Sequence, residues 1–509
     1  MSDRPDNPRE AFDLALQHHK AGRLDEAAAL YRNILETSPH HAGAFHMLGL
    51  LAYQSGEAAT AIEMIDKALH IEPNDSGAWY NLGNAFTAAG RWEEAVSAFR
   101  RAIDLTPNFI EAHNNLGNAL REQGKPEEAL ACYRHAVSLL PEFAPAHNNL
   151  GKLLTDLGRL DEAIACSRQA LSVIPNFPGA YNNLGIALAA QGKTQEAMAS
   201  YRRAIAIDPN FAEPYYNLGT TLADLNRLDE AVSAYQRAIA IKPDFTSVHH
   251  NLAIAFGDQG KLDEAIACYR RVAEIDPDNS SARHMLAALT GETTESTPPE
   301  YVKNLFDLFS AKFEHQLVEV LEYDVPALIR QAFGDLLKKG VRFHNAIDLG
   351  CGTGLAGVQF RNIADRLTGI DISPQMVEKA REKGVYDELS VGNLIEFVSQ
   401  TEEKFDLILA TDVFVYMGNL QPVFASMAHC AADGAYFLFS NESIEEGDYI
   451  LRPTGRYAHS RAYIRSLAER YGFSIEYCRS VDVRKEKDRG IPGDLFILAK
   501  TKQSNQTQS

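Results

Sequence analysis

Prolines spaced by 34 residues constrain the fold of this 509-residue chain more than any other feature. Eight of them recur in constant phase, at positions 39, 73, 107, 141, 175, 209, 243 and 277. A segment like GRLDEA keeps the same period, beginning at positions 22, 56, 90, 124, 158, 192, 226 and 260. Two signals repeated in this way indicate a repeated structural unit, and a period of about 34 residues is typical of a helix-turn-helix repeat. We therefore expect stacked helical hairpins in place of one compact core.

The residue types inside each unit explain the period. In units running from 8–41 through 246–279, leucine occupies the seventh position, from Leu14 to Leu252, and a small residue follows it. Alanine recurs in the second half of every unit, from Ala27 to Ala265. The glycine of GRLDEA ends the first helix, and the proline marks the exit from the second. Because one hairpin cannot bury its own apolar face, stacking stabilises the array, and residues 280–290 are predicted to form a capping helix.

These features predict a superhelix of tetratricopeptide (TPR) repeats over residues 8–290, with eight repeats and a capping helix. Asparagine occupies the sixth position of six successive repeats, as Asn81, Asn115, Asn149, Asn183, Asn217 and Asn251. This position faces the concave side of a TPR array, where an amide can bond both the donor and the acceptor of an extended peptide. Alternatively, these asparagines bond neighbouring helices. The segment AHNNLGNALREQGKPEEALACYRHA resembles the TPR arm of the nucleocytoplasmic O-GlcNAc transferases, which implies a protein or peptide partner.

The chain is acidic, with 49 basic and 68 acidic residues and a formal charge of −19. Residues 1–300 hold 25 basic and 39 acidic residues, a charge of −14, and residues 301–509 hold 24 and 29, a charge of −5. Such a field repels phosphate polyanions, which disfavours nucleic acid, and suits a basic or neutral peptide at the repeats. No signal segment or membrane span is evident, so we expect a cytoplasmic protein without membrane contact. The six cysteines show no CxxC pair, which argues against structural zinc or disulfides.

The segment GETTESTPPE, residues 291–300, is predicted to be an extended, exposed linker. From residue 301 to 502 short apolar runs alternate with helical stretches, among them AIDLG, RLTGID, FDLILAT, AYFLFS, FSIEYC and LFILAK. Strands alternating with helices predict an α/β domain built on a doubly wound, mostly parallel sheet. The charged segment VDVRKEKDRG, residues 481–490, is interpreted as a solvated connection between the last two strands.

A glycine-rich loop carries the chemistry of this second domain. In AIDLGCGTG, an apolar strand leads through Asp348 into a loop that contains Gly350, Gly352 and Gly354. Glycines permit a tight turn and the close approach of a nucleoside ligand to the backbone. The next strand ends at Asp371, where a carboxylate can accept both hydroxyls of a ribose. The absence of a following GK[ST] excludes a phosphate-binding P-loop, whereas NAD fits a glycine loop and an acid equally well.

The elements that follow decide between the cofactors, in the order GIDISPQMVEKAR, ELSVGN, KFDLILATDVFVYM and ADGAYFLFSNES. With the loop, they resemble the class I S-adenosylmethionine (SAM)-dependent methyltransferases, whose domain is Rossmann-like. The resemblance implies that SAM is the cofactor. It places Asp348 and the loop with Cys351 against the methionine and ribose, Asp371 on the ribose, Ile372 and Met376 on adenine, and Asn393 and Leu394 at the adenine edge. Asn393 stands where the family commonly carries Asp, and its amide oxygen can accept from the exocyclic amine.

Candidate catalytic residues follow the fourth and fifth strands, at the sheet edge that holds the loop. They are Asp412, Tyr416 and His459, with Glu442, Arg456 and Tyr457 nearby in the sequence. An acceptor with a proton to lose needs a base among them. Asp412 can instead order the loop or hold the amino group of the cofactor, and His459 can cap the helix that begins near Ser460. Phe309, Phe313 and Tyr323 are placed to form a lid or to pack in the core. No metal is expected.

More narrowly, DLFSAKFEHQLVEVLEYDVPALI, DVFVYMGNL and PTGRYAHSRAYIRSLAERYGF resemble the predicted bacterial TPR-linked methyltransferases. The sequence therefore predicts a SAM-dependent methyltransferase whose TPR arm recruits a protein partner or substrate. Two alternatives stay open. One is a scaffold in which the methyltransferase fold only senses SAM, and the other is a small-molecule methyltransferase localised by its repeats. The methyl acceptor is not evident from the sequence.

Overall fold

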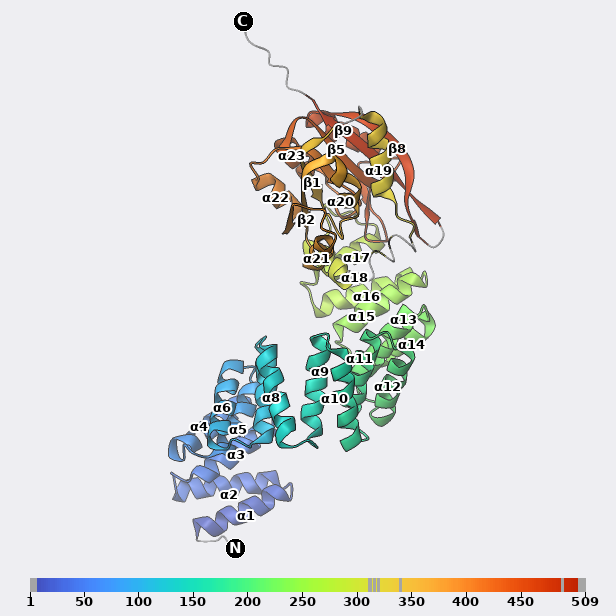
Figure 1. Ribbon diagram of the computed structural model, residues 1–509. Coiled ribbons are helices and arrows are strands. Elements are labelled where there is room, and N and C mark those ends of the chain that lie inside the picture. The colour runs from blue at the N-terminus through green and yellow to red at the C-terminus, as the bar shows by residue number, and fades with distance from the viewer. Residues whose placement is uncertain are drawn as a thin grey trace. The chain divides into compact units, whose positions relative to one another are not determined.

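The computed structural model describes residues 7–309, 314, 317, 321–337, 341–486 and 489–501 (Figure 1). The chain divides into two compact units, residues 1–243 and residues 244–509. The second unit contains the eighth repeat, the predicted capping helix and the α/β domain. The last repeat thus belongs to the same compact body as that domain.

The first unit consists of seven helical hairpins, each with a first helix of 13 residues and a second of 14. Its helices are α1 (Pro8–Lys20), α2 (Leu24–Thr37), α3 (Ala42–Gln54), α4 (Ala58–Ile71), α5 (Ser76–Ala88), α6 (Trp92–Leu105), α7 (Ile110–Glu122), α8 (Pro126–Leu139), α9 (Ala144–Asp156), α10 (Leu160–Val173), α11 (Pro178–Ala190), α12 (Thr194–Ile207), α13 (Ala212–Asp224) and α14 (Leu228–Ile241). The predicted array of TPR hairpins is confirmed.

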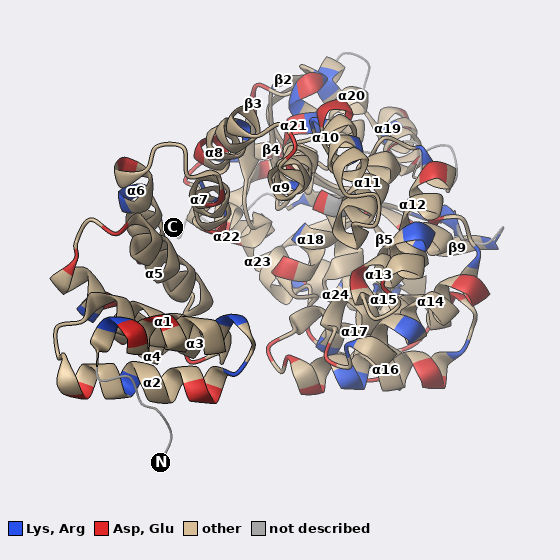
Figure 2. Cartoon of the chain, turned by 90° about the horizontal axis from the view of Figure 1, so that it is seen from below, with Lys and Arg blue, Asp and Glu red and all other residues tan. Residues whose placement is uncertain are grey.

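The repeated residues form the turns and the contacts within each hairpin. The turn glycine has a left-handed backbone, as at Gly124 (φ +72°), and Asn226 takes the same conformation (φ +57°) in the one repeat that lacks the glycine. The small residue after the repeated leucine makes room for a side chain of the second helix, which is an aromatic ring at Gly83, Gly117, Gly185 and Gly219. A Cβ on Gly117 would lie 2.6 Å from Cε1 of Tyr133. The second helices, such as α2, carry charges of both signs (Figure 2).

The second unit begins with the eighth hairpin, α15 (Thr246–Asp258) and α16 (Leu262–Ile275), and continues into α17 (Ser280–Thr290). Helix α17 has the bounds predicted for the capping helix. Asn279 caps its first turn, and Gly291 ends it in a left-handed conformation. The chain then runs through residues 291–298 into α18 (Pro299–Phe309), which packs beside α21 (Pro374–Glu382) of the α/β domain (Figure 1).

The α/β domain is built on one nine-stranded sheet with the order β3-β2-β1-β4-β5-β7-β6, from which β9 and β8 branch at β5. Its strands are β1 (Phe343–Leu349), β2 (Ala364–Asp371), β3 (Glu388–Val391), β4 (Phe405–Ala410), β5 (Ala431–Ile444), β6 (Tyr449–Leu451), β7 (Tyr457–Ser460), β8 (Phe473–Glu486) and β9 (Arg489–Lys500). The pairs among β1 to β5 are parallel, and β9 is antiparallel to β5 and β8. The predicted doubly wound domain is confirmed as a mixed sheet. Hairpin β6–β7 was not predicted.

Helices cover both faces of this sheet, because the residues of its strands alternate between two apolar clusters. On one face Ile347 and Phe437 pack with Phe424 and Ile464, and on the other Ala346 and Leu438 pack with Phe333. The helices of the domain are α19 (Val325–Leu336), α20 (Leu355–Phe360), α21 (Pro374–Glu382), α22 (Leu394–Gln400), α23 (Gln421–Cys430) and α24 (Arg461–Arg470). The short turns η2 (Arg361–Ile363) and η3 (Phe414–Tyr416) complete it.

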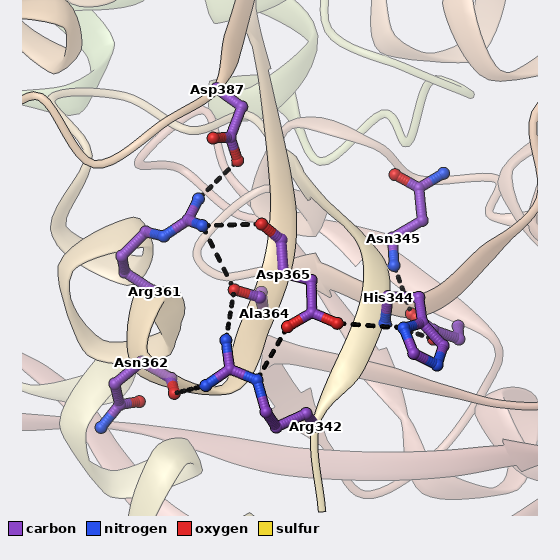
Figure 3. A network of polar contacts seen from close by, with 9 residues as sticks. Arg342, His344, Asn345, Arg361, Asn362, Ala364, Asp365 and Asp387 are labelled. Carbon is purple, nitrogen blue, oxygen red and sulfur yellow. Dashed lines mark hydrogen bonds and ion pairs between the residues drawn. The ribbon is translucent and has the colours of Figure 1, made fainter.

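Exposed ion pairs tie the amino ends of β1, β2 and β3 together. Arg342 donates through Nε to Asp365 at 2.7 Å, and Arg361 donates to Asp387 at 2.5 Å (Figure 3). Exposed pairs contribute about 0–1 kcal/mol each. This network lies at the end of the strands opposite the glycine-rich loop, and we assign it a structural role.

Within the described part of the chain, no helix has both the length and the apolar character needed to cross a membrane.

Candidate functional site

A pocket lies at the carboxyl ends of β1 to β4. The strand order reverses between β1 and β4, because β2 and β3 follow β1 on one side and β5 follows β4 on the other. In open α/β sheets this switch point is where ligands bind. The pocket is lined by the loop after β1 (Gly350–Thr353), Asp371 and Ile372 after β2, Gly392–Ile395 after β3, Thr411–Val413 with Tyr416 and Met417 after β4, and Ser296, Thr297, Pro299, Val302 and Phe306. It therefore includes most of the residues predicted to hold a cofactor.

The glycine loop is shaped by left-handed backbone at three positions. Gly350, Gly352 and Gly354 have φ values of +66°, +52° and +90°. A Cβ on Gly350 would lie 2.6 Å from Cγ2 of Val413, so only glycine fits there without a shift. The amide of Cys351 donates to the carbonyl of Ile370 at 2.9 Å, which fastens the loop to β2. The loop thus offers the pocket its backbone.

Asp371 connects the loop to the end of β2. Its Oδ2 accepts the amide hydrogen of Gly352 at 2.9 Å, and its Oδ1 accepts that of Ser373 at 2.9 Å. Burial raises the pKa of Asp371, and these two hydrogen bonds oppose the change. The side chain is thereby held in one orientation at the pocket wall.

Four other predicted cofactor residues differ in their surroundings. Asn393 and Leu394 line the pocket, but Oδ1 of Asn393 accepts the amide hydrogen of Ile395 at 2.9 Å and so caps α22. Met376 is fully buried and is not part of the pocket lining. Ile372, by contrast, is part of that lining.

Asp348 lies beneath the loop and does not line the pocket. It is fully buried, with Oδ2 accepting the Tyr386 hydroxyl at 2.6 Å, and no partner in the described protein reaches Oδ1. Burial raises the pKa of Asp348 to about 7, although the bond from Tyr386 lowers it. Sequence reasoning missed Tyr386. The feature of the sequence that points to Tyr386 is the pair of glycines Gly357 and Gly369, because a Cβ at either position would lie within about 3 Å of the Tyr386 ring.

Asp412 has a strained backbone at the other end of the pocket, with φ +57°. A non-glycine residue in this conformation costs roughly 1–3 kcal/mol and often marks a functional site. Its amide donates to Oγ of Ser440 at 2.9 Å, and its carboxylate lies 3.6 Å from Arg456 and 3.8 Å from Arg484. The two guanidinium groups thus place positive charge beside the carboxylate group of Asp412.

Tyr416 also lines this end, beside Asp412. The guanidinium of Arg456 lies 5.5 Å from the centre of its ring, and Phe306 packs against the ring edge-on at 5.4 Å. Burial raises the pKa of Tyr416 to about 12, although Arg456 opposes the change. Its hydroxyl is therefore protonated at neutral pH and suits a hydrogen-bond donor better than a base.

A buried ion pair supports Asp412 from behind. Glu442 accepts from Arg484 at 2.6 Å and from Arg452 at 2.7 Å, and the side chains of Glu442 and Arg484 are 1% exposed. The prediction that residues 481–490 form a solvated connection between the last two strands is wrong for Arg484, because the side chain of Arg484 is buried. Strand β8 continues to Glu486 and stays paired with β9 along this stretch. Arg484 therefore lies within the sheet, and its side chain reaches Glu442.

His459 is not brought to the pocket. It lies on β7, fully buried, and its Nε2–H donates to the carbonyls of Met417 and Gly418 at 2.8 and 3.0 Å. Burial lowers its pKa to about 4. Ser460 itself caps α24, through its bond with the amide of Tyr463. Of the predicted lid, Tyr323 lines the pocket, while Phe313 and the side chain of Phe309 lie outside the described residues.

The asparagines of the repeats form bonds from one repeat to the one before it. Nδ2 of Asn149 donates to Asn114 at 3.0 Å, Asn183 to Asn148 at 2.9 Å, and Asn217 to Asn182 at 2.8 Å, in each case through Oδ1 of the acceptor. Asn115 donates to Tyr80 and Asn84, and Asn81 bonds His46. Asn251 lies half-buried on α15. The inter-helix role that the sequence left open is therefore present, and it uses the amide donors.

Comparison with known proteins identifies both halves of the chain. A methyltransferase-domain family matches residues 347–437. TPR-repeat and tetratricopeptide-repeat families match residues 18–84, 83–124, 110–143, 151–192, 187–226, 221–260 and 247–279. The chain thus carries TPR repeats followed by a methyltransferase domain, as the sequence predicts.

The curated relatives are distant. A malonyl-[acyl-carrier protein] O-methyltransferase of Hamiltonella defensa is 26% identical over 130 residues, 26% of this chain and 48% of the relative. A ubiquinone biosynthesis O-methyltransferase of Shewanella halifaxensis is 22% identical over 152 residues, 26% of this chain and 63% of the relative. The chain thus spans about half of the length of the first relative and less than two thirds of the length of the second.

Solved structures with some similarity include the anaphase-promoting complex hetero-tetramer Cut9-Hcn1, with a TM-score of 0.44, 18% identity and coverage of 55% of both chains. Another is the TPR protein TTC0263 of Thermus thermophilus, with a TM-score of 0.32, 23% identity and coverage of 36% of this chain and 98% of that one.

Within the described ranges, no group of three or more His, Cys, Asp or Glu side chains could hold a metal ion.

The buried carboxyl of Asp348 makes stability depend on pH. Its pKa of about 7 in the folded protein exceeds the ordinary value of 3.8. Between these values the folded protein keeps a proton that the unfolded chain has lost, so stability falls as pH rises through this interval. We predict that Asp348→Asn loses less unfolding free energy than the wild type between pH 4 and pH 8, by a few kcal/mol. Urea denaturation at both pH values measures this difference.

The matched control is Asp335→Asn, which changes an exposed carboxylate on α19. This variant is expected to keep the pH dependence of the wild type. An Asp348→Asn protein that also keeps it would contradict the assigned titration.

Proposed function

We propose that the chain is a SAM-dependent methyltransferase whose TPR repeats bind a protein partner or substrate. One observation carries the proposal: the backbone amide of Gly352, in the open glycine loop, is hydrogen-bonded to Asp371 at the mouth of β2, within one pocket. This hydrogen bond joins a stretch of backbone that a ligand can approach closely to a carboxylate that can accept hydrogen bonds from hydroxyl groups. The methyltransferase-domain match over residues 347–437 supports the same conclusion.

The residues fit SAM by their chemistry. Asp371 suits the ribose hydroxyls, because a carboxylate oxygen that accepts one amide keeps a further lone pair. Ile372 and Leu394 supply apolar walls for adenine. The Nδ2 group of Asn393 is left to bond the polar edge of the adenine ring. Asp348 lies buried beneath the loop, its Oδ1 has no partner in the described protein, and a cation bound nearby would favour the ionised form of this carboxyl group. When bound, SAM supplies a methyl group on a positively charged sulfur.

Asp412 is the residue that we assign to the methyl acceptor. Asp412 lines the pocket, and its carboxylate group lies beside the guanidinium groups of Arg456 and Arg484. An acceptor hydroxyl or amine that donates a hydrogen bond to Asp412 would be oriented by that bond, and the carboxylate of Asp412 would take the proton that the acceptor loses. The buried Tyr416 and the ring of Phe306 packed against it supply an apolar wall at this end. His459 is not proposed as the base, because its Nε2–H is engaged by two backbone carbonyls.

The cofactor assignment predicts that Asp371→Ala weakens SAM binding by about 100-fold or more, because two hydrogen bonds to a charged group are lost. Calorimetric titration with SAM measures the change. The control is Asp365→Ala on the same strand, since Asp365 lies in the exposed network at the opposite end of β2 (Figure 3). Equal affinity of the Asp371→Ala protein and the wild type would refute the assignment.

The catalytic assignment predicts that Asp412→Asn slows methyl transfer by about 100-fold or more while the affinity for SAM changes less than about twofold. Asparagine tolerates the left-handed backbone at this position, so the variant removes charge without new strain. Transfer is measured with labelled SAM on the protein fraction and on the small-molecule fraction of a lysate. A parallel loss of SAM affinity would instead assign Asp412 to the cofactor. SAM binding with no transfer to either fraction would favour a SAM-sensing scaffold.

The TPR repeats are proposed to bind an extended peptide along the row of asparagines. Their Nδ2 donors are used between repeats, so what they offer a ligand is the Oδ1 acceptor, which suits the amide hydrogens of a peptide. The charge of −14 over residues 1–300 favours a neutral or basic peptide. Transfer to protein, and not to small molecules, would support this role.

For this peptide site we predict that the double variant Asn149→Ala and Asn183→Ala binds neutral to basic peptides at least about tenfold more weakly, because two acceptors are lost. Binding is measured by fluorescence polarisation with a panel of labelled peptides. The double control Asn176→Ala and Asn210→Ala removes exposed asparagines from two inter-helix turns. Unchanged binding by the first pair, with an intact helical CD spectrum, would remove the asparagines from the site.

A further inference from the structure

The segment between α17 and α18 is bound to the methyltransferase domain and is more than a tether. The carbonyl of Glu295 accepts the amide hydrogens of Gly418 and Asn419 at 2.9 and 2.7 Å, and the amide of Thr297 donates to the carbonyl of Tyr416 at 3.1 Å. Ser296 forms a β-bridge with Met417. Ser296, Thr297, Tyr416 and Met417 all line the pocket. The segment is therefore a wall of the pocket at its acceptor end.

Helix α17 reaches the same region through His284. This residue is 3% exposed, and its Nε2–H donates to the carbonyl of Gly455 at 3.0 Å. Its ring packs on Tyr301 and Tyr457, with centroid distances of 5.3 and 6.2 Å. Nδ1 of His284 is buried without a partner in the described protein. A buried polar group costs free energy unless its bonds repay it, so an imidazole here calls for a role beyond filling space.

Gly455 belongs to the turn between β6 and β7 that presents Arg456. Its amide donates to the carbonyl of Arg452 at 2.9 Å, and its φ is +75°. A Cβ on Gly455 would lie 2.9 Å from Sδ of Met285, so α17 lies directly against this turn. The next residue, Arg456, pairs with Asp412 and covers the ring of Tyr416. A short chain of contacts thus runs from His284 through the turn to Asp412.

Apolar packing fixes the same contact. Ala287 and Ala288 of α17 form one buried cluster with Leu451 and Tyr457 of hairpin β6–β7. Thr294 and Tyr457 share a hydrogen bond of 2.5 Å between their hydroxyls. Helix α17 and the hairpin therefore pack as one body.

We propose that His284, on the last helix of the TPR array, is a positioning residue that holds Arg456 and Asp412 at the acceptor end of the pocket. The inference rests on the proposed function and extends it. The catalytic unit then begins inside the repeat array, at α17, and not after the linker. His284 occupies the fifth repeat position, the one that Asn114, Asn148 and Asn182 occupy in earlier repeats. The same position thus serves the repeats in one part of the chain and the catalytic domain in another.

The test compares His284→Leu with His284→Gln in the full-length chain. Leucine fills the space without a donor, whereas glutamine can still donate to the carbonyl of Gly455. We expect His284→Leu to slow methyl transfer by about tenfold or more, because a small displacement of a catalytic group has a large effect on rate. SAM affinity should change less than about twofold, since the glycine loop is untouched, and His284→Gln should restore most of the rate.

The control is His250→Leu, the same change at the same repeat position one repeat earlier, where the ring packs on Tyr269. It should leave both the rate and the SAM affinity unchanged. Transfer by His284→Leu at the rate of the wild type would overturn the proposal. So would equal loss of rate in His284→Leu and His284→Gln.

Hydrogen exchange followed by mass spectrometry gives a readout that needs no methyl acceptor. In His284→Leu, the amides of residues 416–419 and 452–457 should exchange faster than in the wild type, and in His284→Gln they should not. Should His284→Leu unfold, Thr294→Val weakens the same contact through Tyr457 and should give the same pattern. Unchanged exchange would overturn the proposal. A wild type that transfers no methyl group would refute the proposed function alone, because exchange still tests His284.

Discussion

The apolar face of a TPR hairpin must be covered by something, and the end of this array is covered by the methyltransferase domain. Helix α17 has the position and bounds of a capping helix, yet it buries Ala287 and Ala288 against Leu451 and Tyr457. A capping helix that ends an array ordinarily turns a polar face to water. Here the contact that completes the array also positions the turn before β7, so the stability of the last repeat and the geometry of the pocket depend on one interface.

The pocket itself depends on a different constraint, the reversal of strand order at β1 and β4. Parallel strands direct their carboxyl ends to one edge, and the reversal leaves that edge open for a ligand. Glycines at positive φ keep side chains out of the opening, and the bond from Gly352 to Asp371 holds its two sides together. At the far side, the strained backbone of Asp412 is supported by Ser440 and by two arginines. Strain is stored where the surrounding structure can hold it.

Local patterns made much of this architecture predictable. The 34-residue period predicts the hairpins because each repeat makes the same short-range contacts, and Asp371 was found because strand lengths and turns fix its distance from the glycine loop. Residues 280–290 are predicted as a capping helix because the last hairpin of a stacked array cannot bury its own apolar face. These inferences need only periodicity and the chemistry of single residues.

Long-range partners were not predictable in this way. Tyr386 and Asp348 are separated by 38 positions, and Arg484 and Glu442 by 42. A charged segment such as residues 481–490 looks solvated until the pairing of β8 with β9 shows where Arg484 is carried. His459 looked like a base because it follows the fifth strand, but the β6–β7 hairpin turns it toward two carbonyls and away from the pocket.

By itself, the sequence determined the repeats, the two kinds of domain and the acidic residue at the end of β2, since period and spacing are encoded along the chain. Only the tertiary structure decided which polar groups meet. It assigned the amide donors of the asparagines to neighbouring repeats, brought Ser296 and Thr297 into the pocket wall, and joined His284 to the turn that carries Arg456. The reason is physical: burial forces each polar group to find a partner, and packing, not spacing, determines which partner is within reach.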